Sequence, residues 1–436
     1  MASIGFGKIP ARLLSPALGM ALLTAVIAFP ARASDAGSSG VPLQKNFEIY
    51  GFAEADAIED SKRVDPNWTD AFRPSKIGVD NAQGVNPYGA NGENSVSVKQ
   101  SRFGVKGLMP TGDGNDPVAF KFEFDLFGVG VNAGQTTIRF RHVYGEWEQI
   151  LAGQTNTLFM DVDVFPNVID YWGPSGMVFL RNPQIRWTPY KTDTAHFSVA
   201  IERPGNDIDT GNVRLIDQYS TAAVQNQEKV PDLTSQFRLD QGWGHVQVAG
   251  ILRRVGFEYQ TVAGQGAWTT GYNTGWGVNL SGAIKTVGKD QILLQVVHGN
   301  GIASYMNDGG TDLAPTATFN PLVPNSPGLS TEAVHLTGLV AYYDHYWSQK
   351  FSSSIGYSST QVTNTNFQNA AAFHKGQYAS VNLLWYPVNN VMMGGEVLWG
   401  ERTNNNNVGL TGNAVGQSGT DTRFQFTVKY NFGIQL

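Results

Sequence analysis

The amino-acid sequence predicts an all-β fold, a transmembrane antiparallel β-barrel of about sixteen strands. Three observations predict it. Many segments alternate apolar and polar residues, a secretory signal precedes them, and short connections take turns with long ones. The 50 glycines and the low share of charged residues, 15%, suit a chain of many strands joined by tight turns.

Residues 1–33 have the pattern of a secretory signal peptide. Lys8 and Arg12 form a basic beginning, and a short apolar run follows over 18–29. An A-x-A cleavage pattern ends at Ala33, after which we expect the signal peptide to be removed. An N-terminal membrane anchor is the weaker alternative, because the run is shorter than the ~20 residues that cross a bilayer as a helix.

Export of the chain limits its partners and its chemistry. We expect a short periplasmic segment over 34–45 and a barrel over 46–436. Loss of the signal peptide changes the formal net charge from −6 to −9, because it removes three basic residues and no acidic ones. A net-acidic exported chain is a poor nucleic-acid binder. There is no cysteine, so neither disulfides nor thiolate metal sites are expected.

The last strand shows the alternation most strictly. Apolar and polar residues take turns from Arg423 to Leu436, which predicts a strand with one apolar and one polar face. In a barrel the apolar face meets lipid and the polar face lines a wet interior, with Tyr430 and Phe432 toward the membrane interface. This strand must also pair with the first one, over 46–55, so that no edge stays open in lipid.

The connections between strands distinguish a barrel from a soluble sandwich. Short connections alternate with longer ones near 59–93, 156–179, 204–231, 301–330 and 404–419. Outer-membrane barrels have tight periplasmic turns on one side and longer external loops on the other. A soluble sandwich with Greek-key crossings has no reason for such alternation, so the pattern favours the barrel.

Five segments carry a further signal, namely Ser101–Val105, Phe122–Gly128, Ile138–Trp147, Leu151–Thr188 and Ala200–Gly205. They resemble the DcaP-like family of trimeric outer-membrane porins, most densely over Leu151–Thr188. This resemblance implies a homotrimer in the outer membrane that passes dicarboxylates and related small anions.

Alternation along the strands predicts a basic wall inside the barrel. The residues expected to face outward are Phe103, Val105, Phe120, Phe122, Phe124, Ile138, Phe140, Tyr144, Ile185 and Trp187. Together with the nearby Arg181, the cations expected to line the pore are Arg102, Lys121, Arg139, Arg141 and Arg186. Arginine suits anion selection because its planar fork grips a carboxylate and stays protonated. The alternative is that these cations only neutralise Glu123, Asp125 and Glu146 in salt bridges.

The second strand contains a conflict of alternation. Val96 and Val98 have the opposite parity to Phe103, although all three are apolar. We therefore expect a β-bulge in this strand.

The connection over 156–179 carries Asp161, Asp163, Asp170 and Tyr171. A loop this rich in aromatic residues is not expected to lie free in solvent, so we expect it to fold inward and narrow the pore opposite the basic wall. The alternative is packing on the rim at a subunit interface. A calcium site is not expected, because no third ligand lies at suitable spacing.

These observations predict an outer-membrane porin for passive diffusion of small hydrophilic solutes. It would prefer anions such as dicarboxylates and similar aromatic or aliphatic acids, with outer-membrane lipid as its surroundings and no metal or cofactor. One alternative is a barrel-embedded lipase or protease, but the seven histidines are scattered and no catalytic motif is present. The other is an adhesin or receptor that uses the long external loops.

Overall fold

The computed structural model describes residues 46–81, 83–112, 114–128, 137–212, 222–316, 330–405 and 417–436. The expected signal peptide, its cleavage site and the 34–45 segment lie outside the described residues. No helix in the described ranges has both the length and the apolar character needed to cross a membrane. Short 3-10 turns lie in the connections, at Pro66–Trp68, Pro74–Lys76, Val162–Val164 and Ala303–Tyr305.

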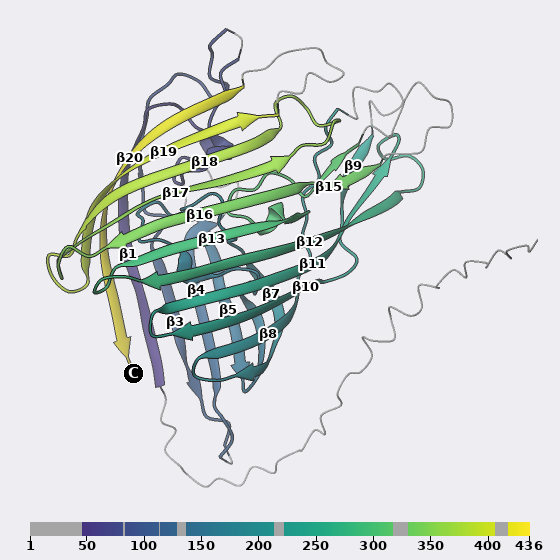
Figure 1. Cartoon of the computed structure of the whole chain (residues 1–436). Coiled ribbons are helices and arrows are strands. Elements are labelled where there is room, and N and C mark those ends of the chain that lie inside the picture. The colour runs from purple at the N-terminus through teal and green to yellow at the C-terminus, as the bar shows by residue number, and fades with distance from the viewer. Residues whose placement is uncertain are drawn as a thin grey trace, which may run out of the picture. The chain divides into compact units, whose positions relative to one another are not determined.

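Sixteen strands close into an antiparallel barrel (Figure 1). In order they are β1 (Asn46–Asp60), β3 (Arg102–Met109), β4 (Val118–Gly128), β5 (Thr137–Trp147), β6 (Ile150–Asn156), β7 (Arg181–Lys191), β8 (Ala195–Glu202), β10 (Asp232–Gln241), β11 (Gly244–Gln260), β12 (Thr269–Lys285), β13 (Gln291–Asn300), β16 (His335–His345), β17 (Phe351–Thr363), β18 (Phe373–Trp385), β19 (Val391–Asn404) and β20 (Ser418–Gln435). Pairing of β20 with β1 closes the barrel. The predicted fold is confirmed.

Four short strands add to this barrel. β2 (Glu93–Ser97) pairs with the C-terminal part of β1, and β9 (Ala223–Gln227) pairs with the C-terminal end of β11. β14 (Leu313–Pro315) and β15 (Thr331–Ala333) form a separate hairpin.

The second strand of the barrel is interrupted between β2 and β3. β3 pairs with the first half of β1 and β2 with the second half, and residues 98–101 belong to neither. Val96, Val98 and Phe103 are all exposed despite their different parity. The expected irregularity is present, and it is a break in the strand that absorbs the odd residue.

A bulge in β5 reverses which residues face outward. Consecutive residues of β4 pair with Phe140 and His142, so Arg141 is the extra residue. Arg141 and His142 are both buried, and Tyr144 then lines an interior cavity. The prediction that Tyr144 faces lipid is wrong, because simple alternation does not count the extra residue.

The last strand has the predicted two faces. Phe424 and Phe426 are 50% and 43% exposed, whereas Gln425 between them is 0% exposed. Exposed apolar residues also cover the outer face of the other strands, as contact with lipid requires.

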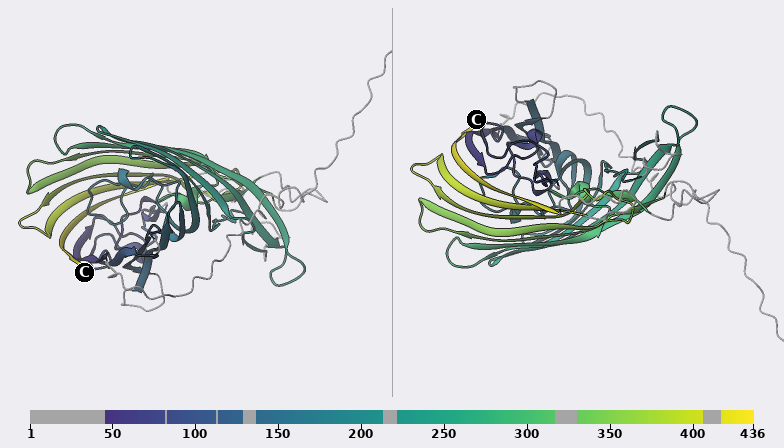
Figure 2. Two further views of the ribbon diagram at one scale, coloured as in Figure 1. Left: turned by 90° about the horizontal axis from the view of Figure 1, so that it is seen from below. Right: turned by 90° about the horizontal axis from the view of Figure 1, so that it is seen from above.

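Chain segments inside the barrel pack against one wall (Figure 2). Phe72, Phe159, Met177 and Met306 from the connections are buried in a core with inward-facing residues of the strands. The residues of this core that lie on the sixteen barrel strands are Ala249, Ile251, Ala283, Leu293, Val297, Leu336, Val340, Tyr342, Val362, Tyr378 and Leu398. They all lie on β11 to β13 and β16 to β19. The opposite wall, β3 to β7, contributes none of them in the described part of the chain.

Two glycines permit a close approach between the 157–180 segment and this wall. A Cβ atom on Gly176 would lie 2.2 Å from the carbonyl oxygen of Ser359, and a Cβ on Gly338 would lie 2.4 Å from that of Gly176. Real Cβ atoms do not approach other atoms this closely. Only glycine at both positions lets the segment lie flat on the wall.

Candidate functional site

Two cavities lie within the barrel and share part of their lining. The larger, about 810 Å³, includes residues of the long connections, such as Arg73 and Asn307. The smaller, about 530 Å³, is lined partly by residues of β1, β3, β4 and β5. Tyr171, Phe179 and Arg181 line both cavities and therefore lie where the two meet.

Basic side chains outnumber acidic ones in both cavities. The larger is lined by the cations Arg73, Lys76, Arg139, Arg181 and Arg402 and by the carboxylate of Asp207. The smaller is lined by the cations Arg102, Lys121, Arg141, Arg181 and Lys429 and by the carboxylates of Glu123 and Asp170. Asp308, Asp125 and Glu54 pair with some of these cations from outside the lining, and cations still outnumber carboxylates in each cavity, which favours an anion over a cation.

Arg139 and Arg141 are tied to carboxylates. Arg139 grips Asp125 with both prongs of its fork, at 3.0 Å from Nε to Oδ1 and 2.7 Å from Nη2 to Oδ2. Arg141 donates to Asp125 at 3.0 Å and to Glu123 at 2.7 Å. The salt-bridge alternative therefore describes the immediate surroundings of these two arginines.

Arg181 differs from the other arginines of the junction. No carboxylate lies within 4.0 Å of it among the described residues, and its buried Nε has no hydrogen-bond partner there. Its guanidinium lies over the ring of Phe179, with 4.8 Å from Cζ to the ring centroid. A guanidinium without a counterion, at the junction of two cavities, can pair with a passing anion.

Arg186 does not share this setting. It donates to the carbonyl oxygen of Asn156 at 2.7 Å and to Gln184 at 3.1 Å, and it lines neither cavity. It faces inward, as alternation predicts, but lies apart from the junction.

The 157–180 segment inside the barrel, called the inner segment below, is fixed beside the smaller cavity by Asp170. Its carboxylate accepts hydrogen bonds from the backbone N–H groups of Phe72 and Gly173, at 2.9 and 2.8 Å. Burial raises the pKa of Asp170. The backbone N–H groups of Ile169 and Asp170 in turn donate to Glu396 on β19. These bonds hold Tyr171 at the junction.

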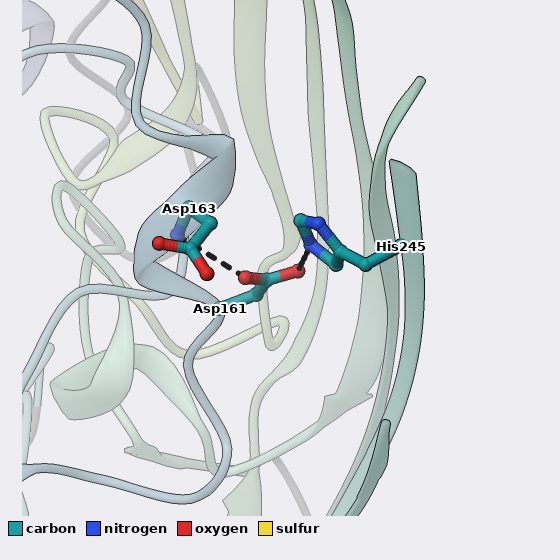
Figure 3. A group of neighbouring side chains, drawn as sticks. All are labelled: Asp161, Asp163 and His245. Atoms are coloured by element: carbon teal, nitrogen blue, oxygen red, sulfur yellow. Dashed lines mark hydrogen bonds and ion pairs between the residues drawn. The ribbon is translucent and has the colours of Figure 1, made fainter. Parts of the chain in front are cut away.

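Asp161 and Asp163 belong to the same inner segment and contact β10 to β12 (Figure 3). Oδ2 of Asp161 lies 2.8 Å from Nε2 of His245 and accepts from Ser281 at 2.7 Å, while Arg238 pairs with Asp163 at 2.6 Å. Burial alone would raise the pKa of Asp161, but the hydrogen bonds from His245 and Ser281 hold it below its ordinary value.

This cluster attaches the segment to the wall and lies outside both cavities. Ligand atoms of Asp161, Asp163 and His245 lie within 4.8 Å of one another, a spacing that a metal ion would accept. Arg238 already supplies the positive charge there, so the group is an ion-pair attachment.

Residues of the connections in the larger cavity were not predicted. The guanidinium of Arg73 lies over the rings of Trp68 and Trp172, at 4.2 and 4.7 Å to their centroids, and pairs with Asp308 at 2.9 Å. The same argument that placed the 156–179 connection inside could have identified this one, since Trp68 and Phe72 are aromatic. Lys76 and Arg402 have no comparable sequence signal.

Comparison with known proteins places these features in context. A family model described as DcaP outer membrane protein matches residues 41–418. The outer membrane channel DcaP of Acinetobacter baumannii is 21% identical with a TM-score of 0.70, over 91% of this chain and 100% of that one. A Salmonella typhi OmpF solved in complex with daunomycin is 11% identical with a TM-score of 0.53, over 88% of this chain and 97% of that one. A search of curated proteins found no match.

Proposed function

Because this chain belongs to the DcaP outer membrane protein family, as its resemblance predicted, we propose that it is a porin with a preference for small anions. It is located in the outer membrane, and its family and fold point to a channel rather than an enzyme. The preferred solutes in this proposal are small acids, above all those with two carboxylates.

The observation that carries the proposal is the free guanidinium of Arg181 at the junction of the two cavities. A solute that passes from one cavity to the other must pass this residue, with Tyr171 and Phe179 beside it. A cation would meet uncompensated positive charge there, whereas a carboxylate would gain a charge-assisted hydrogen bond.

Two carboxylates suit this arrangement better than one. Cations line both cavities on either side of Arg181, with Arg139 in the larger and Arg141 and Arg102 in the smaller. A dianion can therefore contact Arg181 with one carboxylate and a cation in either cavity with the other. A monoanion makes only one of these contacts at a time.

The test is the reversal potential of the purified protein in a planar bilayer under a potassium chloride gradient. We expect wild-type protein to favour chloride, and Arg181→Gln to reduce the chloride-to-potassium permeability ratio by about threefold or more. Arg186→Gln is the matched control, because it removes the same charge from a residue outside both cavities. A cation-selective wild type, or equal effects of the two substitutions, would contradict the proposal.

We extend the proposal to the processing and assembly of the chain. Cleavage after Ala33 follows from the A-x-A pattern and is checked by the mass of the protein in outer-membrane fractions. A homotrimer follows from the family resemblance and is checked by light scattering of the protein in detergent.

A further inference from the structure

We propose that Glu123 is a resident competitor for the anion site of the smaller cavity. Its carboxylate occupies the place that a solute carboxylate takes beside the cations, and so it sets how quickly the solute leaves. This inference rests on the proposed function, because it assumes that small anions pass through this cavity.

Three cations share the carboxylate of Glu123. Arg141 Nε donates to it at 2.7 Å, Lys121 Nζ lies at 3.3 Å and Arg102 Nε at 3.5 Å. Arg141 and Arg102 approach Oε1, and the hydroxyl of Tyr50 donates at 2.7 Å to Oε2, which Lys121 also approaches. Arg141 also pairs with Asp125. Among the described residues, Arg102 and Lys121 have only Glu123, so one carboxylate only partly neutralises them.

Two of the three cations are held loosely. Arg102 and Lys121 lie beyond the 2.7–2.9 Å of a usual charge-assisted hydrogen bond from nitrogen to Glu123. In the described part of the chain neither has a second carboxylate within 4.0 Å, and Nε of Arg102 makes no hydrogen bond. A solute carboxylate can therefore pair with both of them without breaking another ion pair.

The neighbouring Asp125 does not act in this way. It accepts hydrogen bonds from Arg139, Arg141 and Tyr171, is 0% exposed, and lines neither cavity. Glu123, by contrast, lines the smaller cavity together with Arg102 and Lys121. Of the two carboxylates that line the smaller cavity, Asp170 accepts from backbone N–H groups, and Glu123 is the one that shares the cations.

A competing carboxylate has a use in a pore. Conduction requires a site that attracts the solute and yet releases it. Glu123 gives Arg102 and Lys121 a partner within the protein when the solute leaves, so their charges are never without a counterion. Removal of this partner should make the site bind anions more tightly and release them more slowly.

The test is block of the chloride current by succinate in single-channel recordings of the full-length protein. Glu123→Gln removes the charge and keeps an oxygen for Tyr50, and we expect its half-blocking concentration to fall by about threefold to tenfold, with longer blocked intervals. Asp421→Asn is the control. Asp421 accepts from Ser61 and Lys62 through the one oxygen that asparagine retains, and it has no ion pair with a cation of either cavity in the described residues.

The outcomes separate this inference from the proposed function. An anion-selective wild type with the same succinate block in Glu123→Gln, wild type and Asp421→Asn would overturn the inference alone. A cation-selective wild type would overturn the proposed function itself. If Glu123→Gln does not insert, Glu123→Asp withdraws the carboxylate from Arg102 and Lys121, and tighter block than in wild type is then expected. Unchanged block in that variant would also overturn the inference.

Discussion

The hydroxyl of Tyr171 donates a hydrogen bond of 2.8 Å to Oδ2 of Asp125 and thereby joins the inner segment to β4. The same hydroxyl accepts from Arg141 at 2.7 Å, and the Tyr171 ring stacks on Phe127 with centroids 4.0 Å apart. A segment packed on one wall of the barrel is thus held at its tip by the opposite wall. The position of the junction between the cavities depends on this contact.

Tyr171→Phe should loosen this contact while keeping the stacked ring. Loss of the hydroxyl removes a buried hydrogen bond to a charged group, which costs about 1.5–3 kcal/mol. We expect larger fluctuations of the open-channel current in single-channel recordings, with anion preference retained because Arg181 is unchanged. Tyr357→Phe is the control, because Tyr357 lies on the face of β17 that carries the exposed Ile355 and its hydroxyl donates to Gln377 of β18. Equal current noise in both variants would show that the hydroxyl does not hold the junction.

Arg139→Ala combined with Arg141→Ala should shift the reversal potential toward cations. The double substitution leaves Asp125 without its arginine partners and removes the closest cation from Glu123. Loss of partners from a buried charge costs about 3–5 kcal/mol, so we also expect a lower midpoint of urea unfolding in lipid vesicles. Adding Asp125→Asn should recover part of both losses. No recovery in the triple variant would mean that the unpaired carboxylate is not their cause.

Gly176→Ala should displace the inner segment from the wall. The new methyl group would collide with the carbonyl oxygen of Ser359, which is part of the backbone and cannot move aside. We expect a higher single-channel conductance in a barrel that still inserts. Gly395→Ala serves as the control, since its Cβ would meet nothing nearer than 3.6 Å. Wild-type conductance in Gly176→Ala would show that the segment has room to accept the methyl group.

Strong acid should detach the segment at Asp161. The folded-state pKa of this carboxyl lies below its ordinary value of about 3.9, so its stabilising effect is present above that pH and is lost as the pH falls through the folded-state pKa. We expect hydrogen exchange of residues 158–164 to become faster than at pH 6 as the pH falls below the ordinary pKa of the carboxyl, after correction for the intrinsic rate. Asp161→Asn should exchange quickly at pH 6 already and show no acid step. An acid step of the same size in the variant would place its origin elsewhere.

Much of the fold could be predicted because alternation is a local signal. Phe424 and Phe426 mark the outer face of the last strand from neighbouring residues alone, and the closing pair of strands follows from the absence of water in lipid. The conflict between Val98 and Phe103 even revealed the break after β2. Such signals need no knowledge of distant parts of the chain.

The site was less predictable for physical reasons. Alternation fails at Tyr144 because the extra residue in β5 depends on its pairing with β4. Arg181 is expected at the pore only because it lies near the other cations, since alternation with Ile185 would place it on the outer face; it lines both cavities at the point where the inner segment joins β7. Lys76 and Arg402 come from a connection and from a strand end, where no periodic pattern applies. The ion-pair partners of each arginine could not be predicted from the sequence, since they come from tertiary contacts.

The inner segment packs on one side of the barrel. Support of the segment and the charge of the pore wall therefore fall mainly to different strands. Inward residues of β11 to β19 form the hydrophobic core against which the inner segment packs, so substitutions there act on assembly and stability. Among the described residues, inward residues of β3 to β7 contribute nothing to that core, and several of them are charged. An engineer who wishes to change what the pore admits can therefore begin with β3 to β7, provided that the contacts of Asp125 and Arg141 with Tyr171 are kept.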